Sequence, residues 1–535
     1  MRRLLGIAVF CAVAVSAAAV PAKRGAIIRT MEDGTEKTVY LHGNAFSHYM
    51  TDAEGNWLDE MTLEPMSEEA KAERMEHNRA RMQARRVQQK EMVGNKPNIA
   101  PRGLVILVNF ANKKFVTPYD TINNMLNGDN YTRNYSFSYK NDYNREITEH
   151  IISSGSAHQY FHDQSYGQYN PVFDVVGPYT LEQNYSYYGS NVGGDDAHAG
   201  QMIKEACELA DKDGADFTKY DNNNDGRVDF VYVLYAGYGE ADGGPANTVW
   251  PHNYDLGYYG NISCTVDGKK VRNYACSNEI NYINNEHNGI GTFCHEFSHV
   301  LGLPDLYETN QNPKGVHTLF EWDILDYGPY NNDGNTPPSY SAYERFFCGW
   351  LTPRVLKEPE AVWLNPINFK NGESLLICQG DQHNLVGYDP NPKVFYLLES
   401  RVKEGWDQFL PGKGMLITKI SYDASTWEYN TVNNSADKMG VDIIEAKTNN
   451  SSYSKASDAF PGGAKYWYGF DNHEIEQIAI QTGGAVTFSY RGAAQGIEDV
   501  QSDQVQSTKI IKDGQLYLMY KGTMYNVQGL KISDL

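Results

Sequence analysis

The chain has 535 residues, and its 67 acidic residues outnumber its 46 Lys and Arg residues, which gives a formal net charge of −21. Such an acidic balance argues against a general nucleic-acid-binding protein, which needs a basic surface. Because 41% of the residues are apolar and 13% are aromatic, a wholly disordered chain is excluded. At roughly 150 residues per domain, the length predicts about three or four domains.

Residues 1–22 have the pattern of a secretory signal peptide. Two arginines provide a positive start, an apolar run follows from Leu4 to Val15, and Ser16 to Ala19 offers small residues for cleavage near Ala19 to Ala22. The alternative is a membrane anchor, but the apolar run is shorter than the ~20 residues that a spanning helix needs. We therefore expect an exported protein, secreted or at the cell surface, with no membrane span once the signal is removed.

Six cysteines follow the signal peptide. An even number in an exported chain permits disulfides without requiring them. Cys264 and Cys276 are the first candidate pair, because they would close a short loop. Cys294 adjoins the motif described below, and we expect it in the core or in a disulfide rather than in catalysis. The six cysteines are Cys207, Cys264, Cys276, Cys294, Cys348 and Cys378.

The region between the signal peptide and residue 100 changes once from a pattern of strands and turns to a helical pattern. Residues 23–65 are typical of short strands and turns, whereas residues 67–92 predict a helix rich in Glu, Arg, Gln, Ala and Met. This helix is polar nearly all round, so we expect a solvated linker, with a bridge between two domains as the alternative. Pro97 and Pro101 then mark a linker.

Residues 101–350 mix helices and strands. The continuous apolar run at 103–110 predicts a buried strand, the spacing of apolar residues at 199–212 predicts a helix, and 228–236 predicts a second buried strand. From 351 to 492 the pattern changes to short strands and turns, which predicts a separate β-rich domain. The predicted fold class is therefore α+β.

The most informative stretch holds His295, Glu296 and His299, followed by Gly302 and Asp305. Residues four apart on a helix share a face, so the two histidines can direct imidazole nitrogens at one Zn²⁺ ion, with Glu296 beside it. Gly302 can end the helix in a left-handed conformation, so that the chain turns back and Asp305 reaches the same metal. Three protein ligands and a water describe a catalytic zinc site. The alternative is a buried helix with purely structural histidines.

These residues predict hydrolysis of a peptide bond. Zinc lowers the pKa of its bound water toward ~7 and polarises the scissile carbonyl. Glu296 then takes the water proton as general base and can pass it to the leaving amine. No nucleophilic Ser or Cys is needed.

A second group of oxygen ligands lies in the stretch 221–229. Asp221, Asn223, Asp225 and Asp229 occupy positions 1, 3, 5 and 9 of a calcium loop, and the carbonyl of Arg227 could serve at position 7. The twelfth position is not Glu, so this is not an EF-hand. The sequence leaves open a Ca²⁺ site or a polar turn stabilised by its own side chains.

The chain resembles the immune inhibitor A family of secreted bacterial zinc metallopeptidases over residues 100–490. The resemblance implies a metzincin-like peptidase domain, with a mixed sheet plus an active-site helix, followed by a β-rich domain. Protein or peptide substrates are implied as well. The matching blocks are residues 221–237, 239–242, 249–252, 295–307, 322–328, 395–401 and 458–462.

The resemblance places Leu325 where the family has the Met of its Met-turn. That Met packs under the metal without binding it, and Leu has a similar size, so we expect activity to be retained. Tyr327 and Tyr330 follow the turn. We take Tyr327 as a candidate donor to the oxyanion of the reaction, with aromatic packing as the alternative for both tyrosines.

The family also carries an N-terminal pro-segment, which residues 23–100 would represent. The resemblance implies a latent proenzyme, and the stretch from Arg79 to Lys90 is rich in basic cleavage sites. The pro-segment has no Cys, so a cysteine cannot block the zinc. A carboxylate such as Asp52 or Asp59 is the candidate for that role.

Residues 493–535 form a C-terminal tail. Two stretches in it, 509–518 and 522–531, resemble the sorting tails of type IX secretion substrates. The resemblance implies the type IX secretion machinery as a partner. The alternative is a small hairpin that completes the preceding domain.

The leading prediction is a secreted zinc endopeptidase that acts on proteins or peptides. One alternative is a surface adhesin or glycan-binding protein with a vestigial peptidase domain, but the complete set of motif residues argues against it. A zinc hydrolase that acts on a non-peptide amide is a further alternative, which the sequence leaves open.

Overall fold

The computed structural model describes residues 20–31, 35–44, 47–76, 101–140, 145–192, 195–257, 262–309, 316–370 and 372–493, and four strands between 508 and 534. The apolar part of the signal peptide and most of the helix predicted at 67–92 lie outside the described residues, although residues 68–76 are helical as expected. Within the described ranges, no helix is long and apolar enough to cross a membrane.

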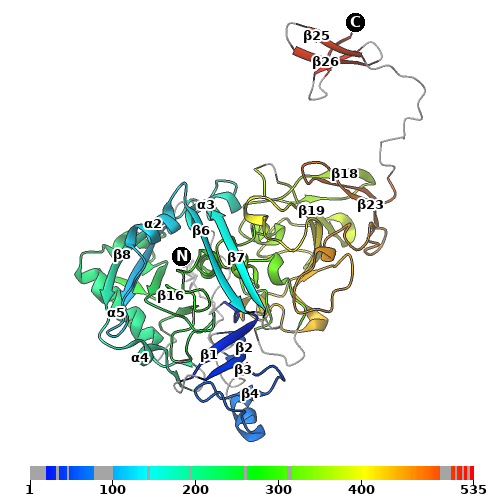
Figure 1. The fold of residues 1–535 in the computed structure, drawn as a ribbon. Helices are drawn as coiled ribbons and strands as arrows, with labels where there is room; N and C mark the ends of the chain where they lie inside the picture. The colour runs from blue at the N-terminus through cyan, green and yellow to red at the C-terminus, as the bar shows by residue number, and fades with distance from the viewer. Residues whose placement is uncertain are drawn as a thin grey trace, which may run out of the picture.

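A five-stranded sheet forms the centre of residues 101–350, which we call the peptidase region after the resemblance that the sequence suggests (Figure 1). Four of its strands are parallel, and the edge strand β13 runs antiparallel to its neighbour β16. In spatial order the strands are β13 (His252–Asp255), β16 (Asn273–Asn278), β12 (Val231–Tyr235), β5 (Arg102–Asn109) and β8 (Val172–Thr180).

Both faces of this sheet are buried, which explains the continuous apolar run of β5. Val105 and Leu107 belong to the hydrophobic cluster on the side of α6 (Gly291–Ser298), whereas Leu104 and Ile106 belong to the cluster on the side of α5 (Ala199–Lys212). Burial on both sides favours apolar residues at every position of a parallel strand. The predicted strand at 103–110 and helix at 199–212 are confirmed.

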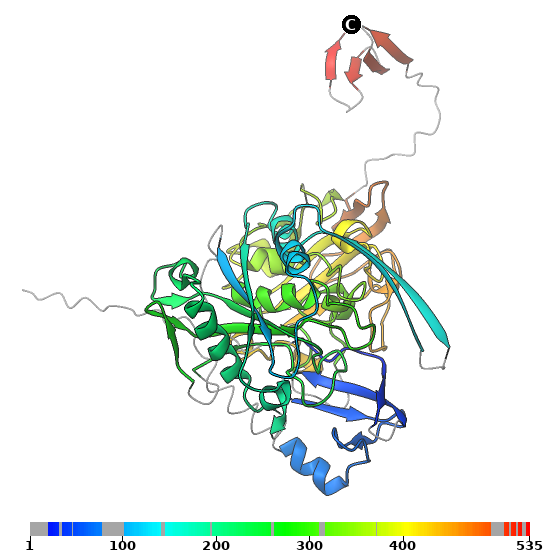
Figure 2. The ribbon, with the colours of Figure 1, turned by 60° about the vertical axis from the view of Figure 1, so that its left-hand side comes forward.

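Smaller elements complete the peptidase region. The hairpin of β6 (Thr132–Lys140) and β7 (Glu146–Ser154) projects from the body of the molecule in Figure 2. The remaining elements are α2 (Tyr119–Asn127), α3 (Ala157–Gln164), α4 (Tyr185–Gly189), β9 (Asn191–Val192), β10 (Asp195–Asp196), β11 (Arg227–Val228), β14 (Cys264–Val266), β15 (Lys269–Val271) and α7 (Ala342–Phe347).

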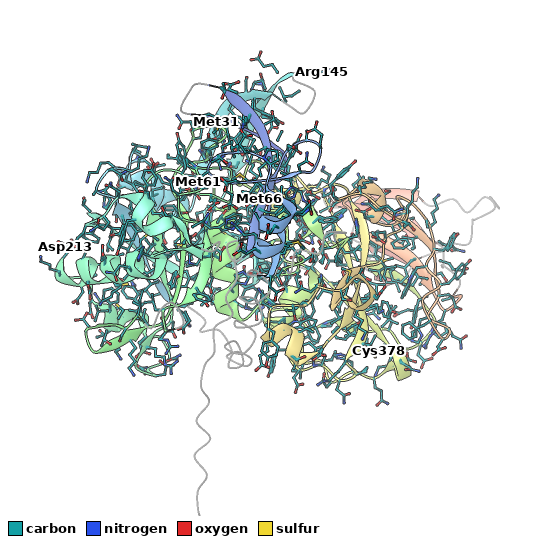
Figure 3. The ribbon with its side chains drawn as sticks, turned by 90° about the horizontal axis from the view of Figure 1, so that it is seen from below. Met31, Met61, Met66, Arg145, Asp213 and Cys378 are labelled. Atoms are coloured by element: carbon teal, nitrogen blue, oxygen red, sulfur yellow. The ribbon has the colours of Figure 1, made fainter. Side chains whose placement is uncertain are left out.

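The first part of the chain, which the resemblance predicts to be a pro-segment and which we call by that name, forms a four-stranded antiparallel sheet that packs on the peptidase region. Its buried side chains share one hydrophobic cluster with Ala241 and Trp250 of the peptidase region. In Figure 3, Met61 and Met66 of the pro-segment lie between Asp213 on one side of the molecule and Cys378 on the other. The strands are β1 (Ala26–Thr30), β2 (Glu36–Asn44), β3 (Ser47–Thr51) and β4 (Trp57–Leu58).

Residues 351–492 are rich in strands, as predicted, but they share a core with the peptidase region. A single hydrophobic cluster contains Leu301 and Leu325 together with Leu397 and Trp427. The strands are β17 (Arg354–Val355), β18 (Glu360–Leu364), β19 (Leu375–Cys378), β20 (Val394–Arg401), β21 (Gly414–Ser421), β22 (Val441–Ile443), β23 (Ile475–Ile480) and β24 (Val486–Tyr490), and α8 (Ala424–Glu428) lies among them.

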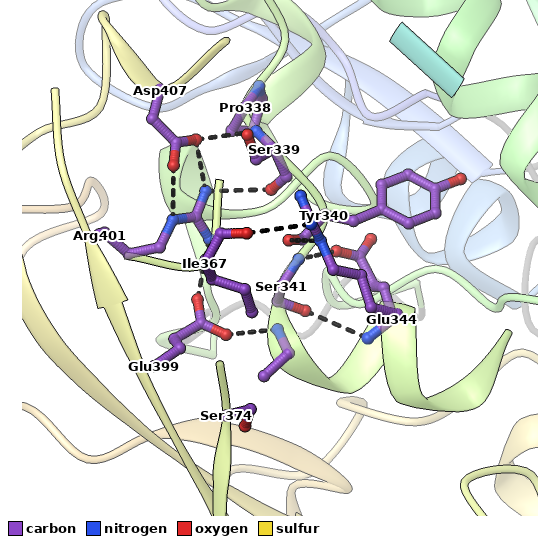
Figure 4. A network of polar contacts seen from close by, with 12 residues as sticks. Pro338, Ser339, Tyr340, Ser341, Glu344, Ile367, Ser374, Glu399, Arg401 and Asp407 are labelled. Carbon is purple, nitrogen blue, oxygen red and sulfur yellow. Dashed lines mark hydrogen bonds and ion pairs between the residues drawn. The ribbon is translucent and has the colours of Figure 1, made fainter. Parts of the chain in front are cut away.

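A buried ion-pair network also fastens the two regions together (Figure 4). The Arg401 guanidinium donates to Asp407 and to Glu399, at 2.7 to 2.9 Å, and to the carbonyl of Ser339 at 3.0 Å. Glu399 in turn accepts from the backbone nitrogen of Ala342 at the start of α7. A buried ion pair is tolerable only when its members are fully hydrogen-bonded, and this network holds the loop before α7 against β20.

The C-terminal tail forms a sheet of its own. The strands β25 (Thr508–Lys512), β26 (Gln515–Tyr520), β27 (Thr523–Asn526) and β28 (Lys531–Asp534) pair in chain order. Among the described residues these strands pair only with one another. They do not complete the sheets of residues 351–492.

The predicted disulfide between Cys264 and Cys276 is wrong. All six cysteines that follow the signal are free. Cys276 lies on β16 next to His252 and the carbonyl of Trp250, whereas Cys264 on β14 lies beside Cys207 of α5. Closeness in sequence misled the prediction, because the two cysteines belong to different sheets. Cys294 is a core residue, as expected.

Candidate metal centre

The motif residues sit at the end of α6, where the helix meets a sharp turn. His295 and Glu296 belong to α6, and His299 opens the short helical turn η2 (His299–Leu301). Gly302 follows with a φ of 87°, so the helix ends in the left-handed conformation that its glycine predicts. The chain then reverses, and Asp305 comes back to the two histidines.

Three potential ligand atoms converge on one point. Oδ1 of Asp305 lies 3.2 Å from Nε2 of His295 and 3.4 Å from Nε2 of His299. All three side chains are at most 1% exposed. These three atoms have no hydrogen-bond partner among the described residues. Buried polar atoms normally have partners, so atoms left bare and aimed at one another fit a bound cation.

The other polar atoms of the same side chains are held in place. Nδ1 of His295 contacts the carbonyl of Ile324 at 2.7 Å, and Nδ1 of His299 contacts that of Leu303 at 2.8 Å. Each carbonyl requires a proton on Nδ1, which leaves Nε2 as a free lone pair. Asn430 donates to Oδ2 of Asp305 at 2.6 Å and accepts from its backbone nitrogen at 2.7 Å. Two imidazoles and one carboxylate, each oriented by a second contact, suit Zn²⁺.

Burial dominates the electrostatics of the site. It lowers the pKa of His295, which favours the neutral imidazole that a metal needs. Burial alone would raise the pKa of Asp305, but the two histidines hold it well below its ordinary value. Burial and the charge of Asp305 raise the pKa of Glu296 well above its ordinary value. A carboxylate with a raised pKa is a stronger base, as proton transfer requires.

The turn that the resemblance identifies as a Met-turn passes beneath His295. Ile324 supplies the carbonyl that contacts this histidine. Leu325 is fully buried, and its carbonyl accepts from the backbone nitrogen of Leu306 at 2.8 Å. Leu325 thus packs in the core beside the site, as expected for this position.

Residues 20–24, which we call the leading segment, enter the site from the N-terminus. The backbone nitrogen of Val20 donates to Oε1 of Glu296 at 2.9 Å. Trp250 donates from Nε1 to the Val20 carbonyl at 3.2 Å, and Tyr330 donates to the Pro21 carbonyl at 2.6 Å. Farther along, Lys23 donates from its backbone nitrogen to the carbonyl of Ala241 at 2.8 Å. The leading segment therefore binds through its backbone, as an extended peptide would.

The two candidate tyrosines have different neighbours. Tyr330 contacts the Pro21 carbonyl, one residue from the contact with Glu296. Tyr327 lies under the guanidinium of Arg24, whose Cζ is 3.4 Å from the ring centroid. Tyr330 is thus the tyrosine that reaches peptide backbone in the site, although the sequence singled out Tyr327.

The two carboxylates that the sequence offered as candidates for blocking the zinc accept hydrogen bonds within their own turns instead. Asp52 accepts from Asn56 and from the backbone nitrogen of Glu54. Asp59 accepts from Thr62 and from the backbone nitrogen of Met61. Val20, which the sequence places at the end of the signal peptide, lies next to Glu296 instead.

The predicted calcium loop uses its oxygens for internal bonds. Asp221 accepts from the backbone nitrogens of Asp225 and Gly226 at 3.0 Å and from Nζ of Lys269 at 2.5 Å. Asp225 accepts from the backbone nitrogen of Arg227, while Asn223 donates to Oδ1 of Asp229 at 3.0 Å. This arrangement is a polar turn in which Lys269 neutralises the charge of Asp221. It gives the calcium hypothesis no support, and that hypothesis stays a prediction.

Comparison with known proteins identifies a peptidase domain around the site. Residues 89–350 match the model of the immune inhibitor A peptidase M6 catalytic domain. Pre-pro-metalloprotease PrtV of Vibrio cholerae is 29% identical over 216 residues, which cover 36% of this chain and 23% of the relative. Immune inhibitor A of Bacillus thuringiensis subsp. alesti is 24% identical over 283 residues, which cover 46% of this chain and 39% of the relative. The alignments thus span well under half of each relative.

Proposed function

Because the chain belongs to the immune inhibitor A peptidase family, we propose that it is a secreted zinc endopeptidase made as a latent proenzyme. The observation that carries the proposal is the convergence of His295, His299 and Asp305 on one point, with Glu296 beside them. The same glutamate contacts the backbone nitrogen of a bound peptide segment. The site therefore joins a metal-binding geometry to peptide binding.

His295, His299 and Asp305 would hold the zinc ion, which when bound polarises the scissile carbonyl and acidifies water. Glu296 takes a proton from the attacking water and delivers it to the leaving nitrogen. The position of Val20 supports this role, since Oε1 of Glu296 is already 2.9 Å from a peptide nitrogen. Tyr330 would donate to a substrate carbonyl as it does to Pro21. Tyr327 would contact a substrate side chain, as it does Arg24.

The position of the leading segment supports the proposal of latency. Val20 is 1% exposed, and the leading segment contacts both Trp250 and Tyr330, so a substrate cannot reach Glu296 while it is bound. The pro-segment sheet anchors the leading segment through the cluster that it shares with Trp250. We propose that signal peptidase cuts before Val20, because residues 20–22 are buried parts of the folded proenzyme.

Removal of the metal tests the proposal. The matured form, meaning the full chain cut between Arg79 and Lys90 and freed of its pro-segment, should hydrolyse an unstructured protein. Chelation should abolish hydrolysis, and added Zn²⁺ should restore it. His299→Ala should lose both zinc and activity, whereas His158→Ala should keep both, because Nδ1 of His158 bonds the carbonyl of Pro171 rather than a motif residue. Hydrolysis by zinc-free protein would overturn the proposal.

A further inference from the structure

The Lys23 side chain of the leading segment enters an acidic pocket. Its ammonium lies 2.9 Å from Oδ1 of Asp333, whose side chain is 4% exposed. Asp242 lines the same pocket, is 5% exposed, and is near enough to Lys23 for the charge of this ammonium to lower its pKa. A lysine of the chain itself thus occupies a pocket that carries two carboxylates.

Asp242 is not fully satisfied by its surroundings. Asn278 donates to Oδ2 of Asp242 at 3.0 Å, but Oδ1 is buried without a hydrogen bond from the described residues. Burial raises the pKa of Asp242 to about 6, and the charge of Lys23 opposes the rise. A buried, partly unpaired carboxylate is costly, so the pocket gains stability from a cation.

Two hydrogen-bond donors from neighbouring side chains orient the carboxylate of Asp333. Its Oδ2 accepts from the Tyr135 hydroxyl at 2.7 Å and from the amide of Asn284. The neighbouring cation Arg133 is directed elsewhere, to Asn335 at 2.9 Å and to Glu286 at 3.6 Å. Lys23 is therefore the cation that neutralises Asp333, and its removal with the leading segment would leave both carboxylates available.

The next residue of the leading segment has an acidic and aromatic site as well. The Arg24 guanidinium lies over the rings of Tyr327 and Phe320, with Cζ at 3.4 and 4.2 Å from their centroids. Its Nη1 lies 3.4 Å from Oε1 of Glu321. Stacking on aromatic rings and pairing with a carboxylate both favour arginine. Two consecutive basic residues are thus recognised by separate parts of the site.

The contact of Val20 with Glu296 gives the position of these sites along a substrate. Glu296 delivers its proton to the leaving nitrogen, so the nitrogen of Val20 marks the first residue after the scissile bond. By this count Lys23 is the fourth residue after the bond and Arg24 is the fifth. The backbone contact of Lys23 with Ala241 keeps the register that a bound substrate would share.

We propose that Asp333 and Asp242 form a specificity pocket for a lysine or arginine four residues after the cleaved bond. The proposal rests on the proposed function, because it concerns the substrates of the same site. The leading segment then inhibits by presenting the basic side chains that the enzyme selects in its substrates.

Paired fluorogenic peptides test the pocket. The two peptides differ only in the fourth residue after the cut, which is Lys in one and the uncharged norleucine in the other, and mass spectrometry checks the cleaved bond. The matured form should prefer the Lys peptide about 10-fold or more in kcat/KM, because a hydrogen bond to a charged group has this order of effect. Equal values for both peptides would overturn the proposal.

Variants of the pocket make the test specific. Asp333→Asn should reduce the preference for the Lys peptide, measured as the ratio of kcat/KM for the two peptides, to about 2-fold. Asp242→Asn should also reduce the preference for the Lys peptide. It serves as the test variant if Asp333→Asn folds poorly. Asp437→Asn, at an exposed position of the β-rich region, should keep the full preference. A preference that survives in both pocket variants would also overturn the proposal.

A binding measurement separates this proposal from the proposed function. A labelled peptide with the sequence of residues 20–31 should bind the matured form, and replacing its Lys23 by norleucine should weaken binding about 10-fold. If neither fluorogenic peptide is hydrolysed but this difference in binding is found, the proposed function fails and the pocket stands. Equal binding of the two labelled peptides would refute the pocket.

Discussion

The backbone nitrogen of Val20 lies 2.9 Å from Oε1 of Glu296, although 276 positions separate the two residues in the sequence. Both residues are buried, with Val20 1% and Glu296 0% exposed. One oxygen of the glutamate that we assign as general base is therefore occupied by the leading segment, whereas Oε2 is buried without a hydrogen-bond partner among the described residues. Any event that frees Glu296 for catalysis must first displace the leading segment.

Weakening the anchor of Val20 should reduce latency. Trp250→Phe removes the hydrogen bond from Nε1 to the Val20 carbonyl but keeps an aromatic ring. A net loss of about 1 kcal/mol would raise the residual activity of the uncut chain about 5-fold. Trp363→Phe is the matched control, since Trp363 is exposed and its Nε1 donates to Oδ1 of Asn365. Unchanged residual activity in Trp250→Phe would argue against inhibition by the leading segment.

Loss of Asn430 should weaken zinc binding. Its side chain holds Oδ2 of Asp305 at 2.6 Å, and loss of such a second contact typically costs about 10- to 100-fold in metal affinity. Competition with a chelator should reveal this loss in Asn430→Ala. Asn434→Ala is the control, because the Asn434 side chain bonds the hydroxyl and the backbone nitrogen of Thr309. Equal zinc affinity in the two variants would contradict the role of Asn430.

The two tyrosines should differ as phenylalanine variants. Tyr330→Phe removes the donor that contacts the Pro21 carbonyl, so kcat/KM should fall about 10-fold with zinc content unchanged. Tyr327→Phe keeps the ring under Arg24 and should change kcat/KM by less than about 3-fold on a peptide without Arg at that position. A larger fall for Tyr327→Phe would restore the role that the sequence suggested.

The pro-segment should dock less tightly as the pH rises. His48 lies 3.3 Å from Glu240 and 3.6 Å from Glu60, which also binds Arg74. Burial opposes its charge, but the two glutamates raise the pKa of His48 above the ordinary 6.5. A raised pKa stabilises the folded form fully below the unfolded pKa, and this contribution is lost as the pH passes the folded pKa.

Residual activity of the uncut chain, divided by that of the matured form, should therefore increase between about pH 6 and pH 9. His48→Gln should remove most of this increase. His42→Gln is the control, because His42 lies in the same sheet and burial lowers its pKa. A ratio that rises equally in both variants would exclude His48 as the source.

The sequence was sufficient to predict that His295, His299 and Asp305 converge, because the motif is local, and their role as zinc ligands remains a prediction. His295, Glu296 and His299 follow from helical spacing, and Gly302 explains how Asp305 returns. The main strands and α5 were also predicted, because burial on both sheet faces leaves a continuous apolar run and a helical face leaves a period. The metzincin-like detail and the domain boundaries remain predictions.

Contacts across long distances had no local signal. Asn430 lies 125 positions after Asp305, and nothing near it in the sequence indicates a role at the metal. The contact of Val20 with Glu296 could not be predicted, because the small residues before Val20 are typical of the end of a signal peptide. We expected the β-rich region to be a separate domain because the sequence pattern changes at residue 351. The sequence pattern cannot reveal that Leu397 packs in the same hydrophobic cluster as Leu325.

The most direct test of the central claim is hydrolysis of an unstructured protein by the zinc-loaded matured form, compared with Glu296→Gln. The account predicts that the variant keeps its zinc and loses activity by about 10²-fold or more, since a general base contributes on this order. Equal hydrolysis by the two proteins at equal zinc content would contradict the assignment of Glu296 and, with it, the proposed mechanism.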